Sequence, residues 1–355
     1  MNKKTYVFIG RFQPWHIGHQ QVAEYALSQS NKLIILIGSV DQATDFKNPF
    51  TFEQRKLCIE ESLQEIQAKY LSKQEYKEIL VLPVKDYIYN NNKWLNEVQQ
   101  TINENIFQNE EVFLTGFKKD SSSYYLDYFP TWKTDFYLKK IDDLDAKSIR
   151  KEFFLNDYNS KPESAFLFNT TSTVNKFLYS FSHENKSKNY LHLKEEMEFT
   201  MKYREQFKGL KYNIPFLTGD SLVVCAGHVL LIKRSALPGK GLYALPGGFV
   251  DAINDADQIE TAIRKLKEET KIDVPMPVLR GSIKKTGDFS NPERSLNWRI
   301  FTKAVLFQLQ DKFLPKVKSG TDVEKVFWMP ISQVVKNRDK FFEDHFHIID
   351  TLLSI

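Results

Sequence analysis

The fold class predicted from the sequence is an α/β domain with a parallel sheet, followed by an α+β domain. A chain of 355 residues is longer than one ordinary domain of roughly 100–200 residues. Apolar runs that are continuous rather than alternating recur through the first third, and amphipathic segments separate them. This pattern is typical of βαβ units. After about residue 205, strands cluster around few helices, which indicates an α+β arrangement.

The first domain is expected to contain parallel strands with helices between them. The strand-like runs are 5–10, 33–38, 78–84 and 111–117. The helical segments are 19–30, 51–71 and 93–107. Sheets of this kind bind ligands in the crevice beyond the carboxyl ends of their strands, so a site is expected where these strands end.

The second domain is expected to begin with two alternating strands joined by a turn at Ala226-Gly227. A long helix from about Asp255, strands at 298–308 and 324–329, and a closing helix follow. Polar, Ser- and Asn-rich stretches before these elements indicate a linker. The predicted division is therefore a first domain at 1–184, a linker at 185–204 and a second domain at 205–355.

Composition limits the partners and the compartment. A net charge of +4 and a pI near 8.7 suit polyanionic small substrates but are too weak to indicate nucleic acid. Cys58 and Cys225 are predicted to be buried, reduced thiols. No apolar run approaches the roughly 20 residues of a membrane span, and we expect a cytoplasmic protein without a membrane partner. A homo-oligomer is compatible with these features.

The stretch GRFQPWHIGH (10–19) follows the first strand and predicts a phosphate site. Gly10 permits a sharp turn, and the next helix is expected to start near Ile17. His16 and His19 would then lie on one face of a helix start, whose N–H groups and dipole attract anions. Imidazoles and an arginine stabilise the charge that builds on phosphoryl oxygens during nucleotidyl transfer.

This stretch resembles the signature of the nucleotidyltransferase superfamily, in the form found in nicotinamide mononucleotide adenylyltransferases of the archaeal type. NPFTFEQRKLCI (48–59) resembles the family's NPFT-x-x-E-R helix entry, with Gln54 where glutamate is usual. DAKSIRKEF (145–153) resembles its second phosphate motif. The resemblance covers roughly residues 1–180 and implies a Rossmann-like nucleotidyltransferase domain.

The resemblance also implies roles for individual residues. The residues implied to bind ATP are Gly10, Arg11, Phe12, His16, His19, Ser148 and Arg150. Of these, Arg11, His16 and His19 would be catalytic. DYIYNNNKW (86–94) resembles the segment that holds the nicotinamide ring, which implies stacking by Trp94 and polar contacts from Asp86 and Asn91. Ordinary core packing is the competing interpretation of Trp94.

A second informative stretch is ALPGGFVDAINDADQIETAIRKLKEETKI (244–272). Its helix carries apolar residues on one face and carboxylates on another, beside a glycine loop. Adjacent carboxylates such as Glu268 and Glu269 suit Mg²⁺, because hard cations prefer oxygen ligands. A solvated charged helix face is the competing interpretation.

This stretch resembles the Nudix box of diphosphate hydrolases, and the chain around it implies a Nudix domain over about 205–355. The matching residues are Gly248, Arg264, Leu266, Glu268, Glu269 and Ile272. The resemblance implies Arg264, Glu268 and Glu269 as catalytic residues and Gly248, Glu268 and Glu269 as metal ligands. Flanking segments resemble those of ADP-ribose pyrophosphatases, which implies ADP-ribose contacts from Arg234, Arg294 and Arg299.

The box departs from its pattern at Lys265, where glutamate is usual, and at Lys271, where glycine is usual. Lys265 cannot be a metal ligand while protonated, and an ion pair with Glu269 would compete with the cation. The site therefore needs another carboxylate. The acids available to replace it are Asp255, Asp257, Glu260 and Glu324.

Together the two resemblances imply a bifunctional nicotinamide mononucleotide adenylyltransferase/Nudix hydrolase. One half would make NAD and pyrophosphate from the mononucleotide and ATP. The other would hydrolyse ADP-ribose to AMP and ribose 5-phosphate, weakly, with Mg²⁺ or alternatively Mn²⁺. Two alternatives stay open: a first domain that serves another small-molecule adenylyl- or cytidylyltransferase reaction, and a Nudix domain that senses ADP-ribose or NAD without catalysis.

Overall fold

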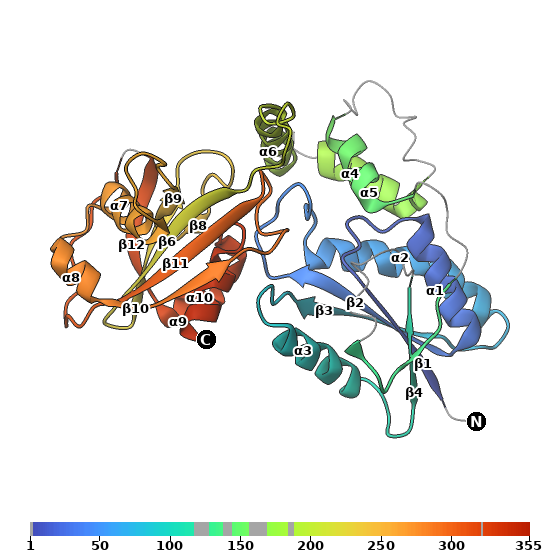
Figure 1. The fold of residues 1–355 in the computed structure, drawn as a ribbon. Coiled ribbons are helices and arrows are strands. Elements are labelled where there is room, and N and C mark those ends of the chain that lie inside the picture. The colour runs from blue at the N-terminus through green and yellow to red at the C-terminus, as the bar shows by residue number, and fades with distance from the viewer. Residues whose placement is uncertain (1–2, 117–127, 138–143, 156–168, 184–187, 321) are drawn as a thin grey trace. The chain divides into compact units, whose positions relative to one another are not determined.

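The computed structural model describes residues 3–116, 128–137, 144–155, 169–183, 188–320 and 322–355 (Figure 1). The chain forms two compact units. The first comprises Met1–Tyr87 and Asn91–Glu195, and the second comprises Ile88–Asn90 and Glu196–Ile355. The short stretch Ile88–Asn90 therefore packs with the second unit although its neighbours in the chain pack with the first.

The first unit contains a parallel sheet with the strand order β3-β2-β1-β4-β5. Its strands are β1 (Lys4–Gly10), β2 (Lys32–Val40), β3 (Glu78–Lys85), β4 (Glu111–Thr115) and β5 (Lys133–Thr134). The predicted parallel α/β fold is confirmed. The two-residue strand β5 was not predicted, because a run this short leaves no periodic signal.

The first three helices of this unit begin close to the predicted starts at 19, 51 and 93, whereas the two that follow were not predicted as separate helices. The helices are α1 (Ile17–Gln29), α2 (Phe52–Leu71), α3 (Asn91–Asn103), α4 (Ala146–Leu155) and α5 (Ser172–His183). Thr51 caps α2 and forms a capping box with Gln54, so the glutamine at the unusual position of the motif still closes the helix start.

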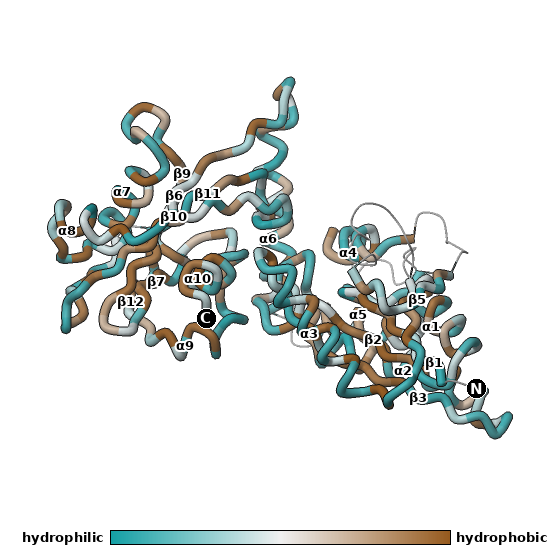
Figure 2. Tube along the Cα trace, turned by 60° about the horizontal axis from the view of Figure 1, so that its bottom comes forward, coloured by the Kyte–Doolittle hydropathy of each residue, from teal (hydrophilic) through white to brown (hydrophobic). Residues whose placement is uncertain are grey.

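Both faces of the parallel sheet are buried. Val7 and Ile9 of β1 lie in one cluster with Val98 and Ile102 of α3. Figure 1 shows α2 on the other side of the sheet from α3. In Figure 2 the apolar segments of this unit gather around β2. Burial on both faces is the physical reason why these strands read as continuous apolar runs.

The second unit is a mixed sheet with the order β10-β11-β6-β7-β12, in which β11 and β6 are parallel and the other neighbours antiparallel. Its strands are β6 (Phe216–Cys225), β7 (His228–Arg234), β8 (Tyr243–Ala244), β9 (Gly247–Phe249), β10 (Ile283–Phe289), β11 (Ile300–Gln308) and β12 (Val323–Pro330). Its helices are α7 (Gln258–Thr270), α8 (Met276–Gly281), α9 (Ile331–Lys336), a 3₁₀ helix (Arg338–Lys340) and α10 (His345–Leu353).

The expected turn at Ala226-Gly227 joins β6 and β7, but the alternating pattern expected for these strands is wrong. Both lie inside the sheet with α7 and α10 packed against the unit's core, so their middle residues are buried on both faces. The expected long helix starts at Gln258, capped by Asp257, rather than near Asp255.

The segment expected as a linker is largely helical, because α6 (Lys188–Glu205) covers most of it. The two units divide within this helix, between Glu195 and Glu196. Cys58 and Cys225 are buried free thiols, as expected. In the part of the chain that the structure describes, no helix has the length and apolar character needed to span a membrane.

Candidate functional sites

The loop after β1 is compact, and aromatic side chains line it. The ring of Phe12 lies 2.7 Å from the position that a Cβ on Gly10 would take, so a side chain at residue 10 would have to displace this ring. Phe12 itself has a φ of 50° and is buried. This tight loop places the start of α1 directly beyond the carboxyl end of β1, where a parallel sheet offers its ligand site.

The structure brings the two predicted histidines together. His16 is the N-cap of α1, and its Nδ1 accepts a 3.4 Å hydrogen bond from the His19 backbone N–H. The two imidazole rings stack with their centroids 3.5 Å apart. Phe12 and Trp15 pack against His19 and hold its ring in place. Both imidazoles therefore lie at a helix start whose dipole favours an anion.

Arg55 connects this loop to the end of β2. Its guanidinium donates to the backbone carbonyls of Arg11 and Gly38, both at 2.7 Å, and of Ser39 at 3.0 Å. The motif at 48–59 contains Arg55, but no role was predicted for this residue. The signal was present, because a buried arginine near a phosphate loop needs acceptors and backbone carbonyls supply them.

Gln13 joins the same loop to the start of α2. Its side-chain amide donates to the Phe50 carbonyl at 2.9 Å and accepts from the Phe50 N–H at 3.0 Å. Arg150 of α4 donates to the Gln13 carbonyl. Three sequence motifs that lie far apart in the chain, around Gln13, Phe50 and Arg150, thus meet at one place. Ser148 lies exposed in the first turn of α4, with its N–H bonded to Asp145 at 2.6 Å.

Three guanidinium groups concentrate positive charge at this site. Burial, together with the nearby charge of Arg11, lowers the pKa of Arg55 and of Arg150 to about 10 each. Asp86 opposes the shift at Arg55. Like charges held this close are stabilised by an anion between them, and a polyphosphate supplies several.

The segment predicted to hold a nicotinamide ring has mixed surroundings. Asp86 accepts hydrogen bonds from the Ser39 N–H at 3.2 Å and the Ser39 hydroxyl at 2.6 Å. Asn91 is exposed at the start of α3. Trp94 is partly buried and packs against the apolar core beside Phe129, with ring centroids 6.1 Å apart. Its surroundings thus fit core packing and leave part of the ring accessible.

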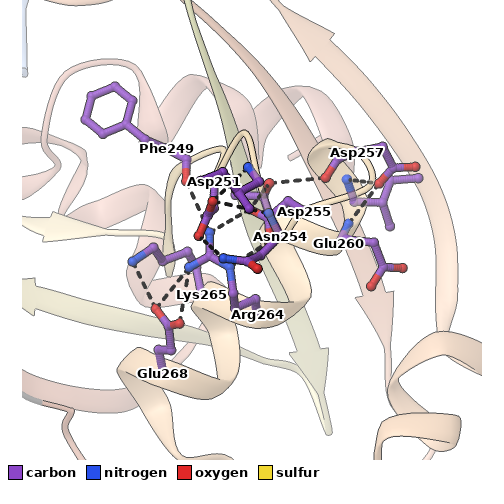
Figure 3. Close-up of polar contacts among 12 residues, drawn as sticks. Phe249, Asp251, Asn254, Asp255, Asp257, Glu260, Arg264, Lys265 and Glu268 are labelled. Carbon is purple, nitrogen blue, oxygen red and sulfur yellow. Dashed lines mark hydrogen bonds and ion pairs between the residues drawn. The ribbon is translucent and has the colours of Figure 1, made fainter.

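In the second unit, a chain of ion pairs runs along α7 (Figure 3). Arg264 forms a bidentate pair with Asp255 at 2.7 and 2.6 Å and reaches both carboxylate oxygens of Glu268 at 3.2 Å. Lys265 lies 2.9 Å from the same Glu268 carboxylate. Arg264 and Glu268, four residues apart on α7, thus form an ion pair. The predicted ion pair of Lys265 with Glu269 is replaced by one with Glu268, one residue closer in the helix.

Glu269 has a different environment from its neighbour. It accepts a 3.0 Å hydrogen bond from the Gly247 N–H. Burial raises its pKa to about 7, helped by the nearby Asp220 carboxylate and opposed by the charges of Lys265 and Arg234. Burial likewise raises the pKa of Asp220 to about 6. An acid whose pKa is close to neutrality beside a glycine loop suits proton transfer or metal binding.

Each of the four acids expected to replace the missing glutamate has another partner in this structure. Asp255 is held by Arg264, Asp257 accepts the N–H groups of Ile259 and Glu260 at the helix start, Glu260 pairs with Arg280 at 2.6 Å, and Glu324 pairs with Lys233 at 2.6 Å. Which of these acids supplies a further metal ligand therefore stays a prediction. Among the described residues no group of three or more His, Cys, Asp or Glu side chains is placed to hold a metal ion. In this arrangement Gly248, Glu268 and Glu269 do not fit a divalent cation without rearrangement.

The backbone conformation of Lys271 explains why the box pattern usually has glycine at this position. It ends α7 with a φ of 45°, in the left-handed region that glycine adopts without strain. Lysine adopts the same conformation here, so the loop geometry of the box is kept although its residue differs.

The three arginines expected to contact ADP-ribose differ in how many other groups hold their guanidinium groups. Arg294 is buried in a bidentate pair with Asp344, at 2.9 and 3.0 Å, and Asp344 also accepts the Tyr89 hydroxyl at 2.5 Å. This arrangement favours a structural role. Arg234 donates to the Pro238 carbonyl at 2.8 Å and lies over the Phe342 ring.

Arg299 lies over the Phe301 ring, and one of its terminal nitrogens is buried without a hydrogen-bond partner. A donor in that state is costly unless a ligand satisfies it, so Arg299 is the best placed of the three for a ligand contact. The roles of Asp220 and Asp344 were not predicted, because no local pattern distinguishes them from other acids.

Comparison with known proteins finds a matching family model in each half of the chain. Residues 7–122 match the cytidylyltransferase-like family model, and residues 216–352 match the NUDIX domain model. The crystal structure of a bifunctional NMN adenylyltransferase/ADP ribose pyrophosphatase from Francisella tularensis aligns with a TM-score of 0.88 and 30% identity over 99% of each chain. A structure with the same description, complexed with AMP and Mn ion, aligns with a TM-score of 0.85.

Curated relatives match each half separately. A nicotinamide/nicotinic acid mononucleotide adenylyltransferase of Acinetobacter baylyi is 40% identical over 126 residues, which are 36% of this chain and 62% of the relative. An ADP-ribose pyrophosphatase of Methanocaldococcus jannaschii is 28% identical over 148 residues, which are 41% of this chain and 81% of the relative. The chain spans about half the length of further adenylyltransferase relatives, such as that of Archaeoglobus fulgidus, at 50%.

The two domain matches, together with the phosphate loop and the box helix, define a fusion of a cytidylyltransferase-like domain with a Nudix domain. Similarity over the full length of the chain to a solved bifunctional protein identifies the family within this class. The chain belongs to the family of bifunctional NMN adenylyltransferase/ADP-ribose pyrophosphatase proteins.

Proposed function

We propose that the first domain transfers the adenylyl group of ATP to nicotinamide mononucleotide, giving NAD and pyrophosphate. The observation that carries this proposal is the junction of three motifs at the start of α1, where two stacked histidines and three arginines gather. The family to which the chain belongs supports it.

The reaction needs positioning and charge more than a protein nucleophile. A phosphate oxygen of the mononucleotide forms a bond to the α-phosphorus of ATP, and the bond from that phosphorus to the bridging oxygen of pyrophosphate breaks. His16, His19 and Arg11 stabilise the charge that develops on the phosphoryl oxygens. Arg150 and Ser148 hold the polyphosphate, which enters with Mg²⁺. Arg55 acts indirectly, because its guanidinium holds the backbone of the loop.

The mononucleotide is bound by the segment around the start of α3. Trp94 offers the accessible part of its ring to the nicotinamide, while Asp86 and Asn91 supply polar contacts. Another adenylyl- or cytidylyltransferase reaction on this fold is the competing function, and it predicts no preference for a pyridine base.

The second domain acts on ADP-ribose, which it hydrolyses slowly to AMP and ribose 5-phosphate with a raised requirement for Mg²⁺ or Mn²⁺. Arg299 and Arg234 contact the ligand, and Glu269 is the acid with the pKa best suited to the chemistry. Sensing of ADP-ribose without catalysis is the competing role, and the ion pairs that hold Glu268 favour it over fast hydrolysis.

One set of incubations tests both halves. Purified protein is mixed with ATP, Mg²⁺ and either nicotinamide mononucleotide or its acid form, and separately with ADP-ribose and each metal, and products are separated by chromatography. Dinucleotide formation supports the first function. The first function is overturned if neither mononucleotide reacts, and the hydrolase is overturned if ADP-ribose stays intact with both metals.

A further inference from the structure

Lys265 occupies the place in the box helix where the pattern has a carboxylate. Its Nζ lies 2.9 Å from Glu268 Oε2, and its aliphatic stem runs along the glycine loop. A Cβ on Gly248 would lie only 3.1 Å from Lys265 Cε. Figure 3 shows the side chains of Lys265 and Arg264 converging on the Glu268 carboxylate. The ammonium group is thus held between the helix and the loop rather than extended into solvent.

The ammonium also acts on the second carboxylate of the box. Its charge is among the influences that lower the pKa of Glu269 against the effect of burial. Its hydrogen bond is the largest influence lowering the pKa of Glu268. Lys265 therefore stands in electrostatic contact with both glutamates.

A divalent ion would have to compete with charges that are already present. Glu268 is shared by Lys265 and Arg264, and each of the four acids expected to add a ligand is held by another group. A lysine ammonium is a compact point charge with three donors, and such a group binds phosphate oxygens well.

We infer that the Lys265 ammonium is the resident cation of this site: it supplies the positive charge beside the diphosphate of ADP-ribose, so the domain binds this ligand without a divalent metal. Metal binds at Glu268 only when Lys265 leaves it. The inference rests on the proposed ligand, but its statement about metal does not, and the two can be tested apart.

The first test uses Mn²⁺ alone and reads bound ion by electron paramagnetic resonance. Wild-type protein should bind Mn²⁺ weakly in the second domain. Lys265→Glu should bind it at least about tenfold more tightly, since it removes a competing cation and adds a ligand. Lys284→Glu, which makes the same charge change at an exposed position of β10, should match wild type. Equal Mn²⁺ affinity in wild type and Lys265→Glu would overturn the inference.

The second test measures ADP-ribose binding by calorimetry in the presence of chelator and of Mg²⁺. The wild-type dissociation constant should agree within about threefold between the two conditions, and Lys265→Met should weaken binding in chelator by about tenfold, as expected for loss of one charged contact. Strict dependence of wild-type binding on Mg²⁺ would contradict the inference. If wild type binds no ADP-ribose in either condition, the proposed ligand is wrong, and the Mn²⁺ titration still decides the role of Lys265.

Discussion

The guanidinium of Arg55 donates a 2.7 Å hydrogen bond to the backbone carbonyl of Arg11, 44 residues earlier in the chain. The same group also bonds the carbonyls of Gly38 and Ser39 at the end of β2. One side chain of α2 therefore fixes the distance between the phosphate loop and the neighbouring strand end. Arg11, whose carbonyl is held in this way, is itself exposed.

Arg55→Met should lower both stability and adenylyl transfer. It leaves three backbone carbonyls without their donor, and each buried acceptor without a partner costs about 1–3 kcal/mol. We expect the free energy of unfolding to fall by at least about 2 kcal/mol. Denaturant unfolding measures this change, and a control, Lys56→Met, alters the partly buried neighbour on the same helix. An unchanged unfolding midpoint in Arg55→Met would contradict the role given to these bonds.

His19→Ala should reduce adenylyl transfer by at least about 100-fold while the fold is kept, because a preorganised group that stabilises transition-state charge is lost. The motivation is its stacked contact with His16 at the start of α1. His183→Ala, on α5 of the same unit, serves as the matched control. Circular dichroism verifies the fold, and near wild-type turnover in His19→Ala would rule out the assignment.

Trp94→Ala separates the two interpretations of this residue. If the ring stacks on the nicotinamide, the Michaelis constant for the mononucleotide should rise by an amount equivalent to roughly 1–3 kcal/mol, while the constant for ATP changes little. If Trp94 serves only to pack against Phe129, stability should fall and both constants should stay the same. Steady-state kinetics with each substrate varied in turn, beside thermal unfolding, distinguishes these results.

Local patterns in the sequence predict elements whose burial is strong and periodic. The strands β1 and β2 are buried on both faces and read as apolar runs. The edge strand β10, with the sequence IKKTGDF, is mostly exposed and gives no such signal, so it was not predicted. The strands β8 and β9 are too short to show any periodic pattern of apolar residues.

The candidate sites were predictable to the extent that they depend on neighbours in sequence. His16 and His19 meet because they are three residues apart on one helix. The contacts of Arg55 and Arg150 with the loop join residues far apart in the chain, so spacing cannot reveal them. The partner of Lys265 could not be chosen from sequence either, since Glu268 and Glu269 are both within its reach on the helix and the burial of Glu269 decides between them.

Lys265→Glu should raise the rate of ADP-ribose hydrolysis at a fixed concentration of Mg²⁺. The change restores the carboxylate of the box pattern and frees Glu268 from one of its two cations. Initial rates measured across a Mg²⁺ titration should show a lower half-saturating concentration in the variant. A rate equal to or below that of wild type at every metal concentration would show that Lys265 is not what limits hydrolysis.

Glu269→Gln should make the second domain more stable relative to wild type as the pH rises. The folded protein holds the Glu269 proton up to a pKa of about 7, above the ordinary value of 4.5. Between these values the folded state binds more protons than the unfolded state, so this group stabilises the fold at low pH and its contribution is lost as the pH rises through 7.

Glutamine cannot ionise, and it can still accept the Gly247 N–H. Asp220 shifts in the same direction and His345 in the opposite one, but both are present in each protein and cancel in the comparison. Thermal unfolding at pH 5 and pH 8 should show a gain for the variant that is larger at pH 8 by at least about 1 kcal/mol, since a tenfold change in a proton-binding constant corresponds to about 1.4 kcal/mol. The same variant should lose ADP-ribose hydrolysis, and a difference in stability that does not change with pH would contradict the raised pKa.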